Sequence, residues 1–194
     1  ATSLTDYWRR WHITLGSWMR DYVFYPLSVC RPMMKLSRFS RKKLGGVVGK
    51  RIPVYLATAV TWFLTGLWHG AAWNFIVWGM LNCLVILVSQ ELEPLYTRFR
   101  QRFPKLTAGR AYHGFMCART FLLMGLIRSL DCYRDVGVTF RMWGSMLTVF
   151  NWGTLWKNVA DLGLTGADWG ILALAVAVMC IVSALSAKKS VRER

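Results

Sequence analysis

The sequence predicts an all-α, multi-pass transmembrane protein with interfacial and re-entrant helices. Three observations lead to this fold class. Hydrophobic residues make up 55% of the 194 residues. The run from Ile52 to Gln90 contains no Asp, Glu, Lys or Arg, and one tilted span needs about 20 apolar residues. Basic stretches flank the apolar runs, as the positive-inside rule expects of cytoplasmic loops.

The charge and the cysteines narrow the class of protein further. The formal net charge is +16. In a soluble protein this charge would suggest nucleic acid, but here the basic residues alternate with apolar runs. We therefore expect membrane lipids and no nucleic acid as partners. The five cysteines form no C-x-x-C pair and no zinc spacing, so we expect no disulfide and no metal site. The chain begins with Ala1 and shows no signal-peptide pattern, and we expect a piece of a longer protein.

Residues 4–25 have the apolar periodicity of an amphipathic helix. Ser3 and Asp6 have the spacing of a capping box, and Asp6 and Arg10 stand four residues apart, so they can pair. We expect Pro26 to end this helix. The segment holds too many charges to face lipid, so it should lie in the interface or pack inside a helical bundle.

The next segments are predicted to leave the cytoplasm and return. Residues 31–51 contain eight Lys or Arg and no acid, which we interpret as a solvated cytoplasmic loop. The uncharged run 52–90 is long enough for nearly two spans. If the basic stretch 98–110 is also cytoplasmic, the run bends near His69 and Gly70. A broken or re-entrant pair of helices is the alternative.

The remaining chain is predicted as helices of mixed polarity and a last span. Residues 111–127 are predicted to span the membrane with Arg119 facing protein, or to lie partly in the interface. Residues 128–168 are interpreted as interfacial helices and loops. Residues 170–187 form a minimal final span. Basic residues then indicate a cytoplasmic end of the chain; they are Lys188, Lys189, Arg192 and Arg194.

His69 is the first candidate for chemistry because it lies in the middle of the uncharged run. An ionisable group at membrane depth is costly and commonly marks a functional site. Gly66 and Gly70 would let another backbone or a substrate approach, and Trp68 and Trp73 could wall a pocket. Desolvation would lower the pKa of His69 and keep the imidazole a neutral base. The alternative is a core histidine bonded to a backbone carbonyl.

His12 is the second candidate, among Trp and Arg side chains that could equally anchor an interfacial helix. His113 we interpret as interfacial. The chain has no G-x-S-x-G elbow, P-loop or dinucleotide-binding glycine motif. The remaining simple chemistry is proton transfer between histidine and a hydroxyl, as acyl transfer requires.

Two segments carry a resemblance to a known family. Residues 6–27, with Trp8-Arg9-Arg10-Trp11-His12, resemble the signature helix of the membrane-bound O-acyltransferases (MBOAT). Residues 62–79, with Gly66-Leu67-Trp68-His69-Gly70, resemble the histidine motif of the same family, closest to its alginate O-acetyltransferase-like branch. Residues 126–130 weakly resemble a later F-R-A segment. The resemblance implies that residues 1–194 are the C-terminal part of one MBOAT-like membrane domain whose N-terminal half is absent.

The resemblance also implies a function. It makes His69 the catalytic histidine and His12 the second one, in an O-acyltransferase of the bacterial plasma membrane that helps to O-acetylate a cell-surface or exported polysaccharide. It implies no bound cofactor, an acyl donor such as acetyl-CoA or another acyl carrier, and an extracytoplasmic acetyltransferase partner. If the two histidines share a site, the 4–25 segment must bring His12 towards His69. The residues expected to bind substrate are Arg9, Arg10, Arg20, Trp68, Trp73 and Asn74.

Two other functions remain open at this stage. The first is D-alanyl transfer to teichoic acid, which belongs to the same family. The second is a membrane transporter or scaffold subunit without chemistry of its own, because deep polar residues also mark transport pathways.

Overall fold

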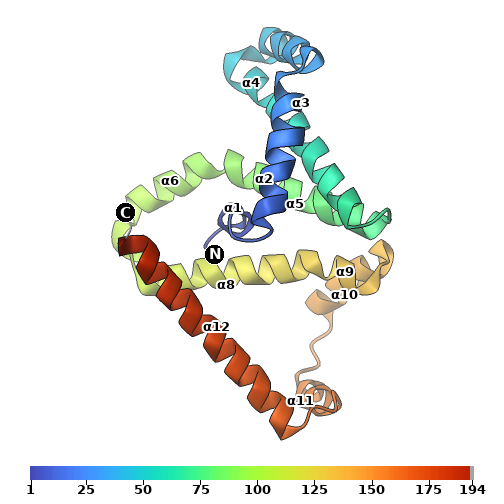
Figure 1. The fold of residues 1–194 in the computed structure, drawn as a ribbon, viewed down its shortest axis with the longest axis vertical. Helices are drawn as coiled ribbons and strands as arrows, with labels where there is room; N and C mark the ends of the chain where they lie inside the picture. Colours follow the sequence, from blue (N-terminus) through green and yellow to red (C-terminus); the bar gives the residue numbers. More distant parts are fainter. Residues whose placement is uncertain (193–194) are drawn as a thin grey trace. The chain divides into compact units, whose positions relative to one another are not determined.

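The computed structural model describes residues 1–192, and every regular element in that range is helical (Figure 1). The predicted all-α class is therefore confirmed. By its internal contacts the chain divides into two compact units, Ala1–Ser145 and Met146–Arg194. Both histidines of interest lie in the first unit, which carries the candidate site.

The first thirty residues do not form the single helix that was predicted over residues 4–25. His12 takes left-handed dihedrals, φ 48° and ψ 45°, and these interrupt a right-handed helix. Tertiary packing overrides the helical periodicity here, because the Trp8 ring packs on Trp62 at 5.0 Å and on Trp78 at 5.8 Å. The helical segments are α1 (Leu4–Trp8), α2 (Ile13–Met19), the π-helix η1 (Arg20–Phe24) and α3 (Tyr25–Val29).

Pro26 does not end the helical segment, contrary to the sequence prediction. The backbone N–H of Tyr25 donates to the carbonyl of Arg20, five residues earlier. In an α-helix the proline ring would clash with the carbonyl four residues before it. The wider π turn directly before Pro26 relaxes that contact, so α3 continues with Pro26 in its first turn.

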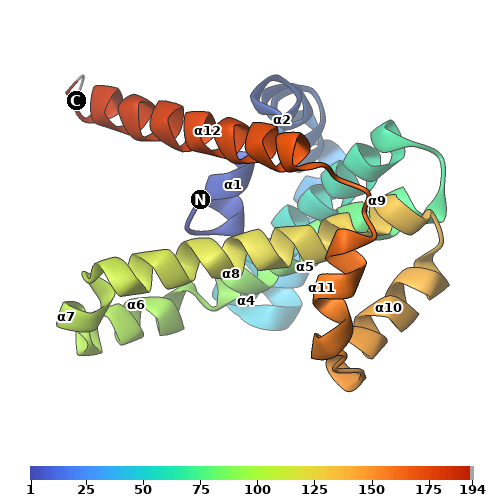
Figure 2. The same cartoon turned by 90° about the horizontal axis from the view of Figure 1, so that it is seen from below.

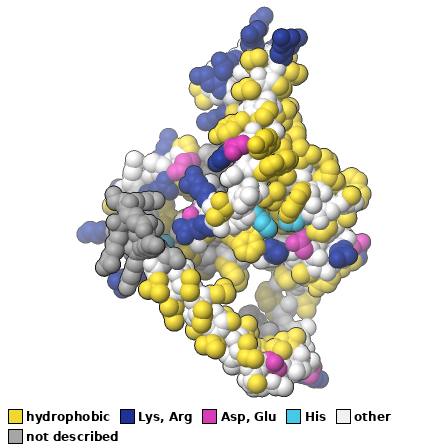
Figure 3. All heavy atoms as spheres, in the orientation of Figure 1, with side chains coloured by type: hydrophobic (Ala, Val, Ile, Leu, Met, Phe, Trp, Pro, Cys, Tyr) yellow, Lys and Arg dark blue, Asp and Glu magenta, His cyan; other side chains and the backbone are white. Residues whose placement is uncertain are grey.

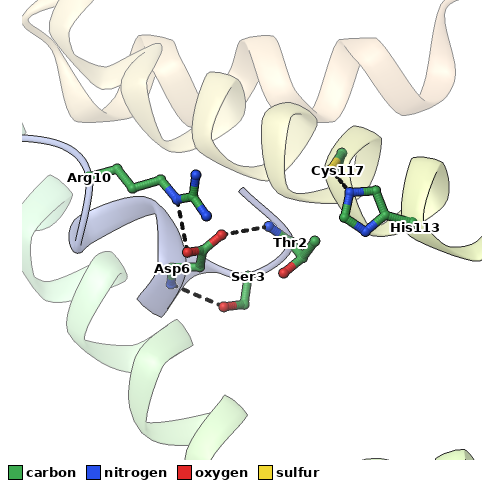
Figure 4. A network of polar contacts seen from close by, with 6 residues as sticks. All are labelled: Thr2, Ser3, Asp6, Arg10, His113 and Cys117. Carbon is green, nitrogen blue, oxygen red and sulfur yellow. Dashed lines mark hydrogen bonds and ion pairs between the residues drawn. The ribbon is translucent and has the colours of Figure 1, made fainter. Parts of the chain in front are cut away.

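The cap predicted at the start of α1 is present. The Ser3 hydroxyl accepts the backbone N–H of Asp6 at 3.1 Å, and Arg10 pairs with the Asp6 carboxylate at 2.9 Å (Figure 4). Asp6 differs from a full capping box because its second oxygen accepts the N–H of Thr2, at 3.1 Å. This polar cluster fixes the entry of the chain into the first unit.

The basic segment 31–51 is helical, so its prediction as a loop is wrong. It forms the first part of α4 (Arg31–His69), which folds back at Gly45, where φ is 80°. The Ser40 hydroxyl lies 2.7 Å from the Gly49 carbonyl oxygen across this fold. The segment before Gly45 is rich in Arg, Lys, Met and Leu, which favour helix whatever their charge. Lys and Arg side chains gather at this end of α4 (Figures 1 and 3).

The predicted bend near residue 69 is confirmed. Helix α4 ends at His69, and α5 (Trp73–Glu91) returns along it. A Cβ on Gly66 would lie 2.5 Å from the Phe75 carbonyl oxygen, and a Cβ on Gly79 2.4 Å from that of Trp62. The two glycines therefore allow the helices to pack backbone to backbone. At the other end of the hairpin, the Glu91 carboxylate pairs with the Arg51 guanidinium and accepts a hydrogen bond from the Tyr55 hydroxyl.

The rest of the first unit encloses the N-terminal end of α5. The core cluster joins Trp78 of α5 to Ile127 and Leu130. Arg119 donates to the Thr2 carbonyl at 3.1 Å, so this side chain faces protein, as expected. Figure 2 shows α6 and α7 next to the start of α8. The elements are α6 (Glu93–Arg102), α7 (Pro104–Thr107), α8 (Arg110–Arg128), α9 (Leu130–Tyr133) and α10 (Val136–Thr148).

The second unit contains α11 (Trp152–Ala160) and α12 (Gly166–Arg192). Helix α12 begins four residues before the predicted span 170–187, because Thr165 and Asp168 accept each other's backbone N–H groups. Among residues 1–192, two helices are long and apolar enough to cross a membrane, α5 and residues 166–185 of α12. The predicted terminal Arg194 lies outside the described residues.

Candidate active site

His69 is the last residue of α4, and aromatic rings surround its imidazole. Ring centroids of Trp78 and Trp68 lie 4.7 and 4.9 Å away, and the Phe75 ring stacks at 6.1 Å. The Nε2 atom is buried and has no hydrogen-bond partner within the part of the chain that the structure describes. The backbone-carbonyl bond that a merely structural histidine would form is thus not made at Nε2, and this buried nitrogen keeps unmet hydrogen-bonding capacity.

His12 lies beside His69, which agrees with the geometric expectation for a shared site. The two imidazole centroids are 6.2 Å apart, and the Trp68 ring is also 6.2 Å from His12. The left-handed backbone at His12 places it at the start of α2, where its side chain caps no N–H. Its side chain is exposed. At this separation both rings can reach one reacting group at their edges. Histidine side chains reach the surface among hydrophobic ones on the face shown in Figure 3.

A cavity of about 430 Å³ opens next to His12, within the size range of small-molecule pockets. Helices α1, α2 and η1 form one wall, and α4 forms the opposite one. The α4 wall carries Thr58, Thr61 and Thr65, whose hydroxyls donate to carbonyls four residues earlier at 2.8 Å. Their oxygen lone pairs remain available, so the wall is apolar with a few hydrogen-bond acceptors.

The structure brings some of the predicted substrate-binding residues to this region. Arg9 and Arg20 line the cavity, although Arg20 also pairs with the Asp21 carboxylate at 2.9 Å. Trp68 stands next to both histidines. The two guanidinium groups and the lining rings of Trp8, Trp11 and Trp62 give the cavity both cationic and aromatic surface, which suits an anionic substrate with an apolar arm, whereas Trp68 is not among the lining residues.

The other predicted binding residues lie away from the cavity lining. Arg10 is turned to Asp6 (Figure 4). The Trp73 side chain is 74% exposed. Asn74 is 1% exposed, and its Nδ2 donates to the Leu130 carbonyl at 3.3 Å. That bond gives Asn74 a structural role in joining α5 to α9, whereas its Oδ1 has no partner in the described part of the chain.

Sequence reasoning missed two charged residues at this site, Arg128 and Asp131. The Arg128 guanidinium lies 6.0 Å from the Trp11 ring centroid, within cation–π distance. Asp131 follows in α9, with a buried Oδ1. The weak likeness of residues 126–130 to a family segment pointed to Arg128. No spacing in the sequence pointed to Asp131, because only the tertiary packing of α9 on α5 brings it to the His69 end of the α4–α5 hairpin.

The electrostatics of His69 come from four sources. Burial lowers the pKa of His69, which lies outside the two candidate spans; Asp131 opposes this shift, while His12 and Arg128 add to it. The pKa of Asp131 is raised, again by burial first, with Arg128 and His69 opposing. A lowered pKa keeps the His69 imidazole neutral near pH 7, in the form that accepts a proton.

Comparison with known proteins identifies the class. Residues 42–127 match the model of the MBOAT, membrane-bound O-acyltransferase family. The probable alginate O-acetylase AlgI of Pseudomonas aeruginosa is 29% identical over 92% of this chain and 29% of its own length. The peptidoglycan O-acetyltransferase of Helicobacter pylori is 32% identical over 56% of this chain and 17% of its own length. The teichoic acid D-alanyltransferase of Bacillus subtilis is 29% identical over 64% of this chain and 30% of its own length.

Over residues 42–127 the chain is similar to the MBOAT family, and these relatives are named as acyl-transferring proteins. It spans less than a third of the length of the curated relatives that it matches. No solved structure matches it significantly.

Proposed function

We propose that this chain carries the histidine site of a bacterial membrane O-acyltransferase that O-acetylates a cell-surface or exported polysaccharide. The observation that carries the proposal is the pair of imidazoles, His12 and His69, whose ring centroids are 6.2 Å apart, with His12 also lining a cavity of about 430 Å³. Relatives named for alginate and peptidoglycan O-acetylation support the acetyl group and the saccharide acceptor.

In the proposed reaction His69 acts as the general base. Its neutral imidazole takes the proton of the accepting hydroxyl while the hydroxyl oxygen forms the new ester bond to the acyl carbon. The bond from that carbon to the donor's leaving group breaks, and the leaving group takes the proton from the imidazolium. His12 orients or polarises the reacting group from the other side. The aromatic rings around His69 bury its Nε2, and electrostatic interactions are stronger at a buried atom than in water.

The cavity supplies the binding side of the proposal. Its apolar walls suit the arm of an acyl donor such as acetyl-CoA or another acyl carrier, and no cofactor needs to stay bound. Arg9 and Arg20 would hold anionic groups of that donor. The Trp68 ring would pack against the acyl group. Arg10 is a weaker candidate for binding the donor, because its guanidinium already pairs with Asp6. Trp73 and the free Oδ1 of Asn74 would meet substrate only from the side of the α4–α5 turn.

The setting that we propose is a multi-pass protein of the plasma membrane. Helix α5 and residues 166–185 of α12 are its candidate spans. The basic segment 31–51 of α4 would face the cytoplasm, and the α4–α5 turn with His69 would lie towards the other side of the membrane. An extracytoplasmic acetyltransferase and the polysaccharide would be the partners, together with membrane lipids.

Replacement of His69 by alanine in the complete gene product tests the proposal. We expect the O-acetyl content of the polysaccharide to fall by roughly 10² or more, the usual contribution of a general base. His113→Ala is the matched control, because His113 lies on α8 near Cys117 and outside the cavity lining; it should retain activity. A His69→Ala protein that reaches the membrane and still acetylates would contradict the proposal. That result would favour a transporter or scaffold, whose role does not depend on a catalytic histidine.

D-alanyl transfer to teichoic acid is the second candidate, because the Bacillus subtilis relative aligns over 64% of this chain. Mass analysis of the ester-linked groups released from the cell surface separates the two. Acetate that disappears in the His69→Ala strain supports the first proposal, whereas D-alanine that disappears supports the second.

A further inference from the structure

The short helix α9 is fastened to the His69 end of the hairpin. Leu130 is fully buried and packs in the core cluster with Trp78 of α5. The Asn74 amide donates to the Leu130 carbonyl at 3.3 Å. These two contacts hold α9 against the first turn of α5. Asp131, the next residue, is therefore kept next to the α4–α5 turn, where His69 ends α4.

Two polar atoms at this junction have unmet hydrogen-bonding capacity. Asp131 Oδ1 and His69 Nε2 are both buried and have no partner among residues 1–192. Buried polar atoms in native proteins are rarely left without a partner. One is a carboxylate oxygen, which accepts, and the other is a ring nitrogen, which donates in one tautomer. The two atoms are therefore complementary in their hydrogen-bonding capacity.

The charges around His69 give Asp131 a distinct place. Besides its own burial, three neighbouring groups affect the pKa of His69: Asp131, His12 and Arg128. Asp131 supplies the negative charge among them and favours the imidazolium, while His12 and Arg128 oppose it. Arg128 also favours the ionised form of Asp131. An anion that stabilises the imidazolium is what a general base needs at the moment when it takes a proton.

We infer that Asp131 is a positioning residue for His69, fixing the tautomer and orientation of the imidazole during acyl transfer. The inference rests on the proposed function. The carboxylate accepts the N–H of one ring nitrogen, directly or through one water, which leaves the other nitrogen as the acceptor for the hydroxyl proton. Asp131 touches neither acyl group nor acceptor, and the proton moves between hydroxyl and His69 alone.

The test is the pH profile of acetyl transfer from acetyl-CoA to a polysaccharide acceptor, measured in membranes that contain the complete gene product. A base that must be neutral gives a rate that rises with pH through its pKa. Because the Asp131 carboxylate favours the imidazolium, Asp131→Asn should lower the pKa of His69 and move the acidic limb of kcat/KM to lower pH. We expect kcat to fall by roughly 10² and KM for acetyl-CoA to stay within about twofold.

Two further variants keep the outcome interpretable. Asp131→Glu restores the charge, so the acidic limb should return to its original pH and part of kcat should be recovered. Asp161→Asn, an exposed aspartate of the second unit, should match the unmodified protein. If Asp131→Asn does not accumulate in the membrane, an Asp131→Glu protein with a displaced limb overturns the inference.

The failure of this inference is distinguishable from failure of the proposed function. An inactive His69→Ala protein together with an Asp131→Asn protein whose acidic limb does not move contradicts the positioning role alone, because a merely structural role would lower the amount of active protein without moving the limb. An active His69→Ala protein contradicts the proposed function itself.

Discussion

His12 has a backbone conformation that L residues other than glycine seldom adopt, with φ 48° and ψ 45°. Such a conformation costs about 1–2 kcal/mol, and residues held in this way concentrate at functional sites. Here it has a visible effect, because it lies between α1 and α2, at the start of α2, where the imidazole lies beside that of His69. The residue therefore lowers stability while placing a reactive group.

Replacement of His12 by glycine should therefore change stability and activity in opposite directions. His12→Gly removes the steric cost at positive φ, so the thermal unfolding midpoint of the detergent-solubilised protein should stay the same or rise. Acetyl transfer should fall by roughly 10². His12→Asn, which also tolerates left-handed dihedrals, controls for the loss of the imidazole. Unchanged transfer in His12→Gly would show that the residue only shapes the backbone.

The arginines of the first segment differ in their partners and should differ in effect. Arg9 lines the cavity, whereas Arg10 pairs with Asp6. Arg9→Ala should raise KM for acetyl-CoA about tenfold, as expected for one lost charge-assisted hydrogen bond. Arg10→Ala should leave KM unchanged and cost little stability, because its pair is mostly exposed. Steady-state kinetics of the two variants check this, and equal effects would contradict the assignment.

Among the elements, the α4–α5 hairpin determines where His69 lies. Its close packing depends on Gly66 and Gly79, whose added Cβ atoms would meet backbone carbonyl oxygens at 2.5 and 2.4 Å. Backbone atoms cannot rotate away as a flexible side chain can. The turn that carries His69 is therefore set by glycine positions some distance along both helices.

Gly79→Ala should destabilise the protein by about 1–3 kcal/mol, the usual cost of overpacking. Gly125→Ala on α8 is the matched control, because a Cβ there meets no atom within 4 Å; it should be neutral or slightly stabilising through its higher helix propensity. Thermal unfolding in detergent measures both. Equal midpoints for the two variants would contradict the close approach of the helices.

Much of the element order follows from the sequence, and the exceptions have local causes. The uncharged run, the glycines and His69 predict the bend between α4 and α5. Charge alone suggested a loop over residues 31–51, but the charged side chains stay solvated on an exposed helix, and their helix propensity outweighs the repulsion between like charges. Pro26 was expected to end the helix over residues 4–25, because the π turn before it has no signature in a single sequence.

The site was predictable where its residues belong to one motif and not where they meet through tertiary packing. The His12 and His69 motifs were recognisable, and their proximity could be expected if they share a site. Trp68 adjoins His69 in sequence. Asp131 belongs to a short helix placed by a buried leucine and an amide bond, and such a placement is encoded in packing rather than in spacing.

At the scale of the whole molecule, the two ends of the α4–α5 hairpin differ: one is charged, and the other carries His69. Arg51 and Glu91 meet at one end, and the turn with His69 lies at the other. The 19 residues of α5 span about 28 Å, close to the thickness of a bilayer's hydrocarbon core. Basic residues adjoin the Arg51 end, and under the proposed topology the positive-inside rule would place this end in the cytoplasm.

This topology predicts opposite labelling of the two ends. In a cysteine-free background, a cysteine introduced at Lys42 or Arg98 should react with a membrane-impermeant maleimide in inverted vesicles but not in intact spheroplasts. A cysteine at Ala71 should show the reverse pattern. Labelling of positions 42 and 71 from the same side would mean that the hairpin is re-entrant.

The central claim is that His12 and His69 serve one reacting group. A double-mutant cycle measures this directly, with His12→Ala, His69→Ala and the double variant assayed for acetyl transfer in membranes at equal protein amounts. Residues that act as a unit are strongly non-additive. We therefore predict that the double variant is no slower than His69→Ala alone, about 10² or more below the unmodified protein. Losses that multiply in the double variant would place the two histidines in independent steps and contradict the account.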